Sequence, residues 1–279
     1  MRWIALAGVA GCNGLFGLNP GQPPPDRVFD APADAPPQCP TMLGQQPQFS
    51  LELHPLIDQP CTSYTTSLVA NRAVAVCNSG TFVGEAAIGD PLVPIPNAPA
   101  ATISLSLDAA LISPEGDFLI ISTFDLDATT SIFESFTRVD DAWVRGPDLP
   151  FPQFTNVSTP TRAPDRHIVS FDRSTAVELH EESPGVWTQV RSFTIDPDPS
   201  PHSHRVWLSA DGLHAIATRL GDTISFAQAF YLERASIDDP FGPPQPTAVT
   251  PPTIELFIEQ DCSRLYTSAV GEVFYALGR

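Results

Sequence analysis

Apolar stretches that begin directly after a polar turn recur along most of this chain. The two clearest copies are "ISPEGDFLIIS", with Glu115 in the turn, and "WLSADGLHAIAT", with Asp211. Fainter copies have Asp165, Asp261 and Asn71 at the turn. Asp, Asn and Gly accept unusual backbone angles, so each copy predicts a strand, a tight turn and a second strand. The intervals between positions 71, 115, 165, 211 and 261 are 44, 50, 46 and 50 residues, which indicates a repeated structural unit.

The strand after the turn is apolar at every position in two copies, residues 73–77 and 118–121. A strand that is apolar on both faces has to be covered on both sides. Neighbouring blades of a β-propeller provide that cover, and the intervals match the length of a propeller blade.

A second element repeats downstream of the first. It consists of an alternating strand, an acidic hairpin turn and an aromatic residue. The three copies are residues 132–150, 176–190 and 229–246, with Trp143, Trp187 and Phe241 as the aromatic residues. Each unit therefore has the content of a four-stranded blade.

The last copy, "GEVFYALGR", stops after one strand and lacks the hairpin and the final strand. The segment "QFSLELHPL", residues 48–56, reads as a strand without a blade of its own. Adding it to the C-terminal blade closes the ring and removes an exposed edge. We therefore predict an all-β propeller over residues 46–279, with five four-stranded blades, or six if residues 40–60 hold more structure. The alternative is a β-sandwich whose hairpin turns look alike.

The repeat resembles the TolB-type, WD40-like propeller repeat of bacterial envelope proteins, in which a Ser-Pro-Asp-Gly turn precedes an apolar strand and then a Tyr-containing strand. Residues 113–116 (SPEG) and 209–212 (SADG) match the turn, and residues 230–232 (FYL) and 274–276 (FYA) match the later strand. The resemblance covers about residues 60–279. It implies a propeller domain that works in the cell envelope.

The composition agrees with such a fold and restricts the partners. The 31 prolines among 279 residues disfavour long helices, and a hydrophobic content of 42% is sufficient for a core. The formal net charge is −18, so most of the surface repels a polyanion. We therefore exclude nucleic acid as a partner.

The chain begins "MRWIALAGVAGCNG", with Arg2 before a short apolar stretch. The apolar stretch is too short to span a bilayer, and small residues at the cut suit a signal peptidase. The motif around Cys12 resembles the bacterial lipobox, which implies that residues 1–11 are a signal peptide and that Cys12 carries a lipid. The alternative is a buried N-terminal strand with an incidental cysteine.

Residues 19–40 are rich in Pro, Asp and Ala and nearly free of large apolar side chains. Such a segment cannot bury enough surface to offset the entropy of ordering. We predict that residues 12–45 form an extended tether. The expected location is the cell envelope, with the N-terminal lipid as membrane anchor, on the periplasmic or surface face of the outer membrane.

Four further cysteines, Cys39, Cys61, Cys77 and Cys262, form an even number, as in proteins of an oxidising, extracytoplasmic compartment. Three pairings are open. Cys39 with Cys61 is the local choice, and Cys77 with Cys262 would then hold the two ends of the chain together. Free buried thiols are the alternative, and the sequence has no CxxC motif.

The common hydrolase, metalloprotease and nucleotide-binding motifs are absent from the sequence. Asp108, Asp125 and Asp127 lie near predicted strand ends, where separated carboxylates could serve a glycosidase. The pair His202 and His204 could hold a metal, and Asp125 with Asp127 could hold calcium. A polar strand at the rim and a solvated loop are the simpler interpretations, so we expect no metal, no cofactor and no catalytic residue.

The expected function is non-catalytic binding or scaffolding in the cell envelope. Loops from every blade converge at one face of a propeller, where binding sites are commonly built. The partner would be a protein or a glycan. The alternative is a polysaccharide-acting glycoside hydrolase with carboxylates in the channel.

Overall fold

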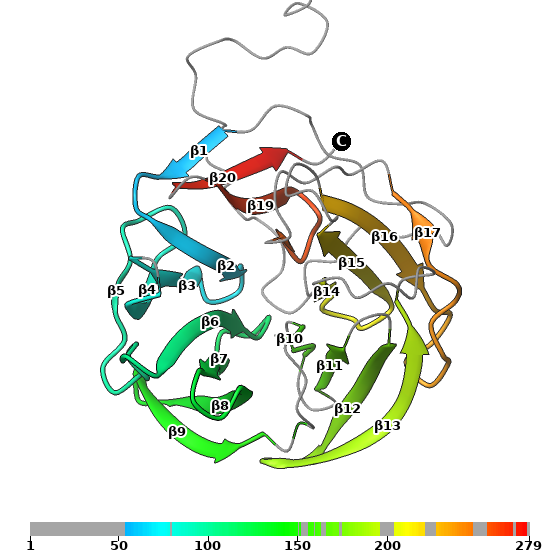
Figure 1. Ribbon diagram of the computed structural model, residues 1–279. Helices are drawn as coiled ribbons and strands as arrows, with labels where there is room; N and C mark the ends of the chain where they lie inside the picture. Colours follow the sequence, from blue (N-terminus) through cyan, green and yellow to red (C-terminus); the bar gives the residue numbers. More distant parts are fainter. Residues whose placement is uncertain are drawn as a thin grey trace, which may run out of the picture. The chain divides into compact units, whose positions relative to one another are not determined.

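Twenty β-strands arranged as five four-stranded sheets make up the computed structural model of the protein (Figure 1). The structure describes residues 54–78, 80–149, 151, 156–158, 160–162, 166–172, 175–195, 204–220, 227–247, 256–269 and 272–277. The predicted signal peptide, Cys12, the tether, Cys39 and Asp165 lie outside these residues.

Four of the sheets, blades 1 to 4, consist of strands that follow one another in the sequence. Blade 1 contains β2 (Cys61–Ser67), β3 (Arg72–Cys77), β4 (Phe82–Ala86) and β5 (Val93–Pro94). Blade 2 contains β6 (Leu105–Ile112), β7 (Phe118–Asp125), β8 (Thr130–Val139) and β9 (Ala142–Asp148). Blade 3 contains β10 (Asn156–Val157), β11 (His167–Asp172), β12 (Thr175–Ser183) and β13 (Val186–Thr194). Blade 4 contains β14 (His204–Leu208), β15 (His214–Leu220), β16 (Ala227–Glu233) and β17 (Gln245–Pro246).

Blade 5 joins the two ends of the described chain. It contains β18 (Leu256–Ile258), β19 (Arg264–Ala269) and β20 (Glu272–Leu277), and β1 (His54–Ile57) pairs with β20 as the outermost strand. The predicted five-bladed propeller and its closure by an N-terminal strand are thus confirmed. The six-bladed and β-sandwich alternatives are wrong.

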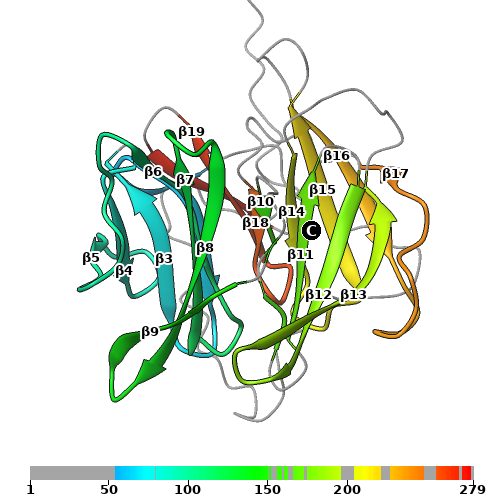
Figure 2. The same cartoon turned by 60° about the horizontal axis from the view of Figure 1, so that its bottom comes forward.

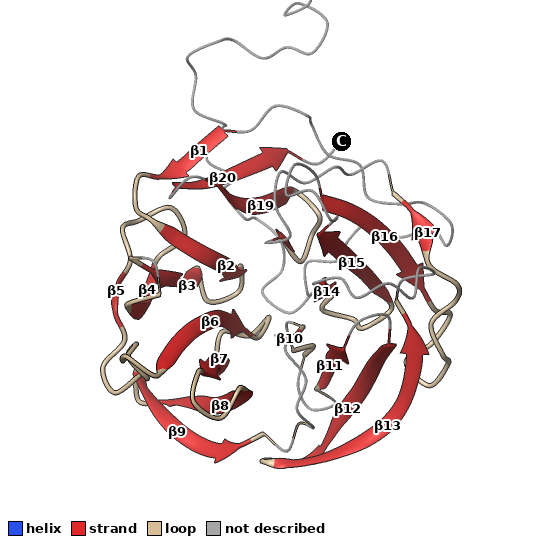
Figure 3. Ribbon diagram, in the orientation of Figure 1, coloured by secondary structure: helices blue, strands red, loops and turns tan. Residues whose placement is uncertain are grey.

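The blades surround a central axis, and the first strand of each blade lies innermost (Figures 1 and 3). In Figure 2 the longer strands, such as β8 and β16, run from one face of the ring to the other. We call the face where the innermost strands begin the loop face, because the connections between blades arrive there. The opposite face, with the turns between first and second strands, is the turn face. Within the described residues, no helix is both long and apolar enough to cross a membrane.

The hydrophobic core lies between the blades. The side chains of β3 show this directly, because they alternate between two cores. Val74 and Val76 pack in one cluster with Leu119 and Ile121 of blade 2, whereas Ala73, Ala75 and Cys77 pack in another with residues of blade 5. The aromatic residues singled out from the sequence are also buried between blades. They are Trp143, Trp187 and Phe241, each at most 8% exposed.

The turn after the innermost strand repeats in backbone detail. Gly116, Gly212 and Cys262 each donate an N–H to the carbonyl three residues earlier, and each has a positive φ, of 75°, 70° and 56°. Asn71, with a φ of 47°, makes the same hydrogen bond to Leu68. The backbone therefore matches Asn71 with Gly116 and Gly212, one position later than the sequence alignment with Glu115 and Asp211.

The backbone also matches His167 with His214. The carbonyl of His214 accepts from the N–H of Ser209, and the carbonyl of His167 accepts in the same way from the N–H of Thr161. Thr161 and His167 are six positions apart, whereas Ser209 and His214 are five apart.

Cys61 and Cys77 form a disulfide between directly paired positions of β2 and β3. Both predicted partners, Cys39 for Cys61 and Cys262 for Cys77, are therefore wrong. The spacing argument failed because it compared sequence separations, whereas the β2–β3 hairpin brings these two positions side by side. Cys262 is disulfide-bonded as well.

Candidate functional site

The central channel is lined by all five innermost strands. Its walls include Thr65 of β2, Leu111 of β6, Val157 of β10, Trp207 of β14 and Phe257 of β18. The cavity has a volume of about 30 Å³, whereas pockets for small-molecule ligands usually measure about 300–1,000 Å³. The channel between the described residues therefore has room for a few water molecules and is too small for a sugar ring.

Two strand irregularities face each other near the loop face. The register of β2 shifts between Thr62 and Thr65, and that of β6 shifts between Leu107 and Ala109. Ser63 in the first irregularity has a φ of 52°. Bulges of this kind redirect side chains and are frequent beside functional sites.

The irregularities bring Asp108 and Ser63 together. The Ser63 hydroxyl donates to the Asp108 carbonyl oxygen at 3.2 Å. The Asp108 carboxylate binds the Arg205 guanidinium at 2.8 Å and accepts from the Ser122 hydroxyl at 3.5 Å. Asp108 belongs to blade 2 and Arg205 to blade 4, so this ion pair connects two blades that are not neighbours. The side chains remain 29% and 17% exposed, and they are the candidate site at the channel mouth.

Asp108 is one of the three carboxylates that the hydrolase hypothesis named. Its partner across the axis is the guanidinium of Arg205. A glycosidase needs two carboxyl groups, about 5–9.5 Å apart, on either side of the bond that is cleaved. The residues lining the described cavity include no carboxylate, and Asp108 faces a cation. This geometry offers recognition by charge and hydrogen bonding, and among the described residues it offers no acid and base pair.

Asp125 is the last residue of β7, and Asp127 lies in the β7–β8 loop that follows at the loop face. One carboxylate oxygen of Asp125 accepts the N–H groups of Asp127 and Ala128, both at 2.9 Å, so Asp125 shapes its own loop. The described residues contain no group of three metal-binding side chains. His202 and the side chain of His204 lie outside the described residues.

The predicted turn residues that are described lie at the turn face. Asp211 accepts from the N–H of Leu213 at 3.0 Å, and Asp261 accepts from the N–H of Ser263 at 2.8 Å. These carboxylates stabilise tight turns. Glu115 lies 3.8 Å from Arg162 of blade 3.

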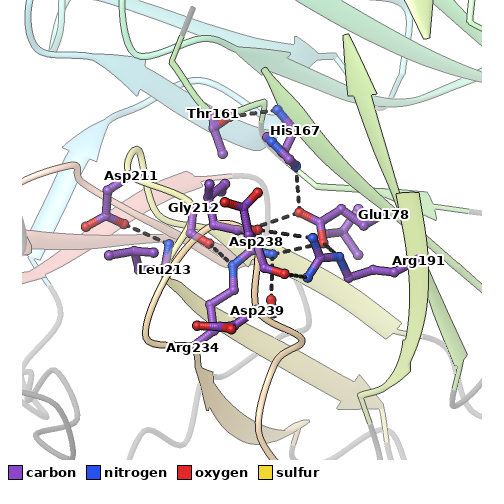
Figure 4. Close-up of polar contacts among 12 residues, drawn as sticks. Thr161, His167, Glu178, Arg191, Asp211, Gly212, Leu213, Arg234, Asp238 and Asp239 are labelled. Atoms are coloured by element: carbon purple, nitrogen blue, oxygen red, sulfur yellow. Dashed lines mark hydrogen bonds and ion pairs between the residues drawn. The ribbon is translucent and has the colours of Figure 1, made fainter. Parts of the chain in front are cut away.

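The most deeply buried charged group is Glu178 of β12, shown in Figure 4. Arg234 of blade 4 binds both of its carboxylate oxygens at 2.9 Å. His167 lies 2.7 Å and Arg191 3.2 Å from the carboxylate. The side chains of Glu178 and Arg234 are both fully buried. Burial alone would raise the pKa of Glu178, but the hydrogen bonds from His167 and Arg234 outweigh it and lower that pKa.

Backbone groups of blade 4 also hold the two arginines of this cluster. Within blade 4, Arg234 donates to the carbonyl of Gly212 at 2.7 Å and lies over the ring of Phe241. Arg191 donates to the carbonyls of Asp238 and Ile237 at 2.9 and 3.2 Å. Because every charge is paired inside the interface between blades, we interpret this cluster as structural.

A different buried carboxylate lies between blades 5 and 1. Glu259 accepts from the hydroxyls of Tyr266 at 2.9 Å, Ser263 at 3.2 Å and Thr66 at 3.4 Å. Burial raises the pKa of Glu259 to about 7, although the hydrogen bond from Tyr266 opposes the shift. Burial likewise raises the pKa of Tyr266. Glu259 is thus largely protonated in mildly acidic solution.

The sequence analysis missed Arg205, Glu178 and Glu259. A signal for the first two is present, since each is a charged residue within an otherwise apolar strand, "RVWL" and "AVEL". The pattern does not reveal their partners, because Arg205 and Asp108 are 97 positions apart.

Comparisons with known proteins find structural similarity alone. No protein-family model matches the chain, and no curated protein matches it. A fructofuranosidase from Schwanniomyces occidentalis, complexed with fructosylnystose, is 10% identical with a TM-score of 0.54, and the match covers 80% of this chain and 58% of that one. A prolyl endopeptidase is 15% identical with a TM-score of 0.41, covering 76% and 32% of the two chains. The WD40 repeats of RRP9 are 9% identical with a TM-score of 0.43, and the match covers 84% of this chain and 100% of that one. The match to the fructofuranosidase, with its TM-score above 0.5, shows the propeller fold alone.

Removing the Arg234 guanidinium from the interface between blades 3 and 4 should lower the free energy of unfolding. Arg234→Met leaves Glu178 without its main partner in a fully buried site, so we expect a loss of about 3 kcal/mol in the free energy of unfolding. The matched control is Arg138→Met. Arg138 binds Glu85 between blades 1 and 2 at 3.1 Å, with side chains 15% and 19% exposed, and Glu85 keeps Arg72 at 2.7 Å. A loss of about 1 kcal/mol is expected there. Urea unfolding measures both, and equal losses would contradict the structural role given to Glu178.

Stability should fall as the pH rises because of Glu259. Its pKa is about 7 in the folded protein against 4.5 for the free side chain. The folded state therefore holds a proton that the unfolded state has released, and this stabilisation is present below pH 4.5 and lost as the pH rises through 7. We expect the free energy of unfolding to drop by about 2 kcal/mol from pH 5 to pH 8. Glu259→Gln should flatten this slope, and the exposed control Glu182→Gln should keep it. An unchanged slope in Glu259→Gln would refute the assignment.

Proposed function

We propose that this protein is a lipid-anchored propeller of the bacterial cell envelope that binds a partner on its loop face without catalysing a reaction. The observation that carries the proposal is the filled channel, which leaves about 30 Å³ and is crossed by the Asp108–Arg205 ion pair. A partner has to contact the face of the ring, so a macromolecule suits this geometry better than a small molecule. A protein or a glycan chain is the partner class we propose.

The loop face has the features of a recognition surface. Asp108 and Arg205 present both charges at the channel mouth, next to the hydroxyls of Ser63 and Ser122. Leu126 in the β7–β8 loop is 52% exposed, and its N–H is held by the carbonyl of Ser104, just before β6, at 2.8 Å. Charged, polar and exposed apolar groups therefore occur together at this face.

The envelope location rests on three observations. The Cys61–Cys77 disulfide suits an oxidising, extracytoplasmic compartment. The lipobox-like motif at Cys12 and the Pro-rich segment after it support a lipid anchor and a tether. The TolB-type turns at residues 113–116 and 209–212 resemble those of envelope proteins.

The binding face can be tested with a photo-crosslinking residue placed on either face of blade 2. Leu126 lies at the loop face and Val139 at the turn face, and they are 52% and 50% exposed. In intact envelopes, the probe at position 126 should give a discrete crosslinked product that Asp108→Asn weakens. The probe at position 139 should give none. Equal products from both positions would contradict a loop-face site.

The anchor is tested by fractionation of the Cys12→Ala variant. Without the thiol no lipid can be attached, so we expect the protein to move from the membrane fraction to the soluble extracytoplasmic fraction. Leu15→Ala changes a residue three positions later and should leave the protein in the membrane fraction. Unchanged membrane association of Cys12→Ala would refute lipidation at Cys12.

A further inference from the structure

Cys262 is disulfide-bonded, while Cys61 and Cys77 are bonded to each other. The remaining cysteines of the chain are Cys12 and Cys39. We propose that Cys262 is joined to Cys39, and that this bond clamps the closure of the ring and fixes the tether to the turn face of blade 5. The choice of Cys39 over Cys12 rests on the proposed lipidation of Cys12, which consumes that thiol.

The position of Cys262 in its turn is unusual. It has a φ of 56°, where the equivalent turns have Gly116, Gly212 and Asn71, and asparagine is the residue besides glycine that adopts this conformation most readily. A residue with a Cβ atom pays a conformational penalty in this left-handed region, which glycine avoids. Cysteine is therefore a poor choice for the turn alone, and the covalent bond accounts for its presence. The side chain is also well placed in the fold, since Cys262 packs in the core cluster that blade 5 shares with blades 1 and 4.

The direction of β1 places its first residue at the turn face, the face where Cys262 lies. His54 pairs with Tyr275, and Tyr275 pairs with Tyr266 on β19. Since both pairings are antiparallel, β1 runs parallel to β19, and the chain comes to His54 from the turn face, where Cys262 lies. From the strand spacing and the rise per residue, the Cα atoms of His54 and Cys262 are roughly 15 Å apart. Cys39 precedes His54 by 15 residues, which can span up to about 50 Å.

The strand that closes the ring is short and has few ladder positions. β1 has four residues and pairs with β20 at three positions, with an irregularity between Pro55 and Ile57. Pro55 has no N–H for the ladder. A pull on a membrane tether would act directly on this short strand. With the bond to Cys262, the load passes to the β18–β19 turn, and β1 stays in place.

The bond forms by ordinary thiol–disulfide exchange. The thiolate of one cysteine attacks the disulfide of an oxidant protein in the extracytoplasmic compartment, forming a mixed disulfide and releasing one oxidant thiolate. The thiolate of the second cysteine then attacks the protein sulfur of that mixed disulfide and displaces the other oxidant sulfur. Two thiols of this chain are oxidised to the disulfide, and the oxidant takes up their two electrons and two protons and is reduced to a dithiol.

Disulfide mapping tests the bond directly. The full chain is alkylated without reduction, digested, and analysed by mass spectrometry. We expect one pair of peptides joined through Cys39 and Cys262 and one joined through Cys61 and Cys77. An alkylated Cys262, a bond from Cys262 to Cys12, or a disulfide-linked dimer would overturn the proposal. The Cys12→Ala variant should give the same map, so a failure of the lipid anchor and a failure of this bond are distinguishable.

The clamp is tested with Cys262→Gly and Cys39→Ser. Glycine relieves the turn and removes the thiol, so a loss of stability in Cys262→Gly reports the missing bond and not a strained turn. Because the bond closes a loop of more than 200 residues, we expect each variant to lower Tm by roughly 10 °C. The double variant should lower it no further. Limited proteolysis should cut the single variants near residues 54–60 faster than the parent, and an unchanged cutting rate in Cys39→Ser would refute the clamp.

Discussion

The structure depends on covering both faces of every blade. Ala73 and Val74 are adjacent on β3, point into different interfaces, and are both fully buried. No blade can satisfy this requirement by itself, because half of its apolar surface needs the next blade. The ring therefore has to close, and the last blade has to be completed by a strand from the other end of the chain. β1 fulfils that role although it has only four residues.

Charged groups add specificity to the interfaces between blades. Arg138 reaches Glu85 between blades 1 and 2, and Arg166 reaches Asp117 between blades 2 and 3. The Glu178 cluster lies between blades 3 and 4. Buried ion pairs contribute little net stability but penalise misalignment strongly, so they favour one register of blade against blade. At the interface between blades 5 and 1, hydroxyl groups instead donate to Glu259, and burial raises the pKa of this carboxyl to about 7.

The strands at the channel mouth depart from the regular repeat of the blades. The irregularities in β2 and β6 and the positive φ of Ser63 set these two innermost strands apart from the described parts of β10, β14 and β18, whose pairings show no register shift. The Asp108–Arg205 ion pair restricts the channel. These features lie at the loop face, where the connections between blades arrive, whereas the turn face carries the repeated structural turns.

The sequence by itself determined the class of fold, the repeated unit, the aromatic residue of the outer hairpins and the closing strand, and the structure decided between five blades and six. These features are local periodicities and repeats, which the order of residues records directly. It did not determine the match of Asn71 with Gly116, because the turn pattern does not show which of its polar residues has the positive φ. It also missed the match of His167 with His214, because Thr161 and His167 are six positions apart whereas Ser209 and His214 are five apart. The partners of Cys61, Asp108 and Glu178 were decided by the tertiary structure. Hydrogen bonds, ion pairs and disulfides depend on which strands the ring brings together. The separation of two residues in the sequence does not predict how close they lie in the folded ring.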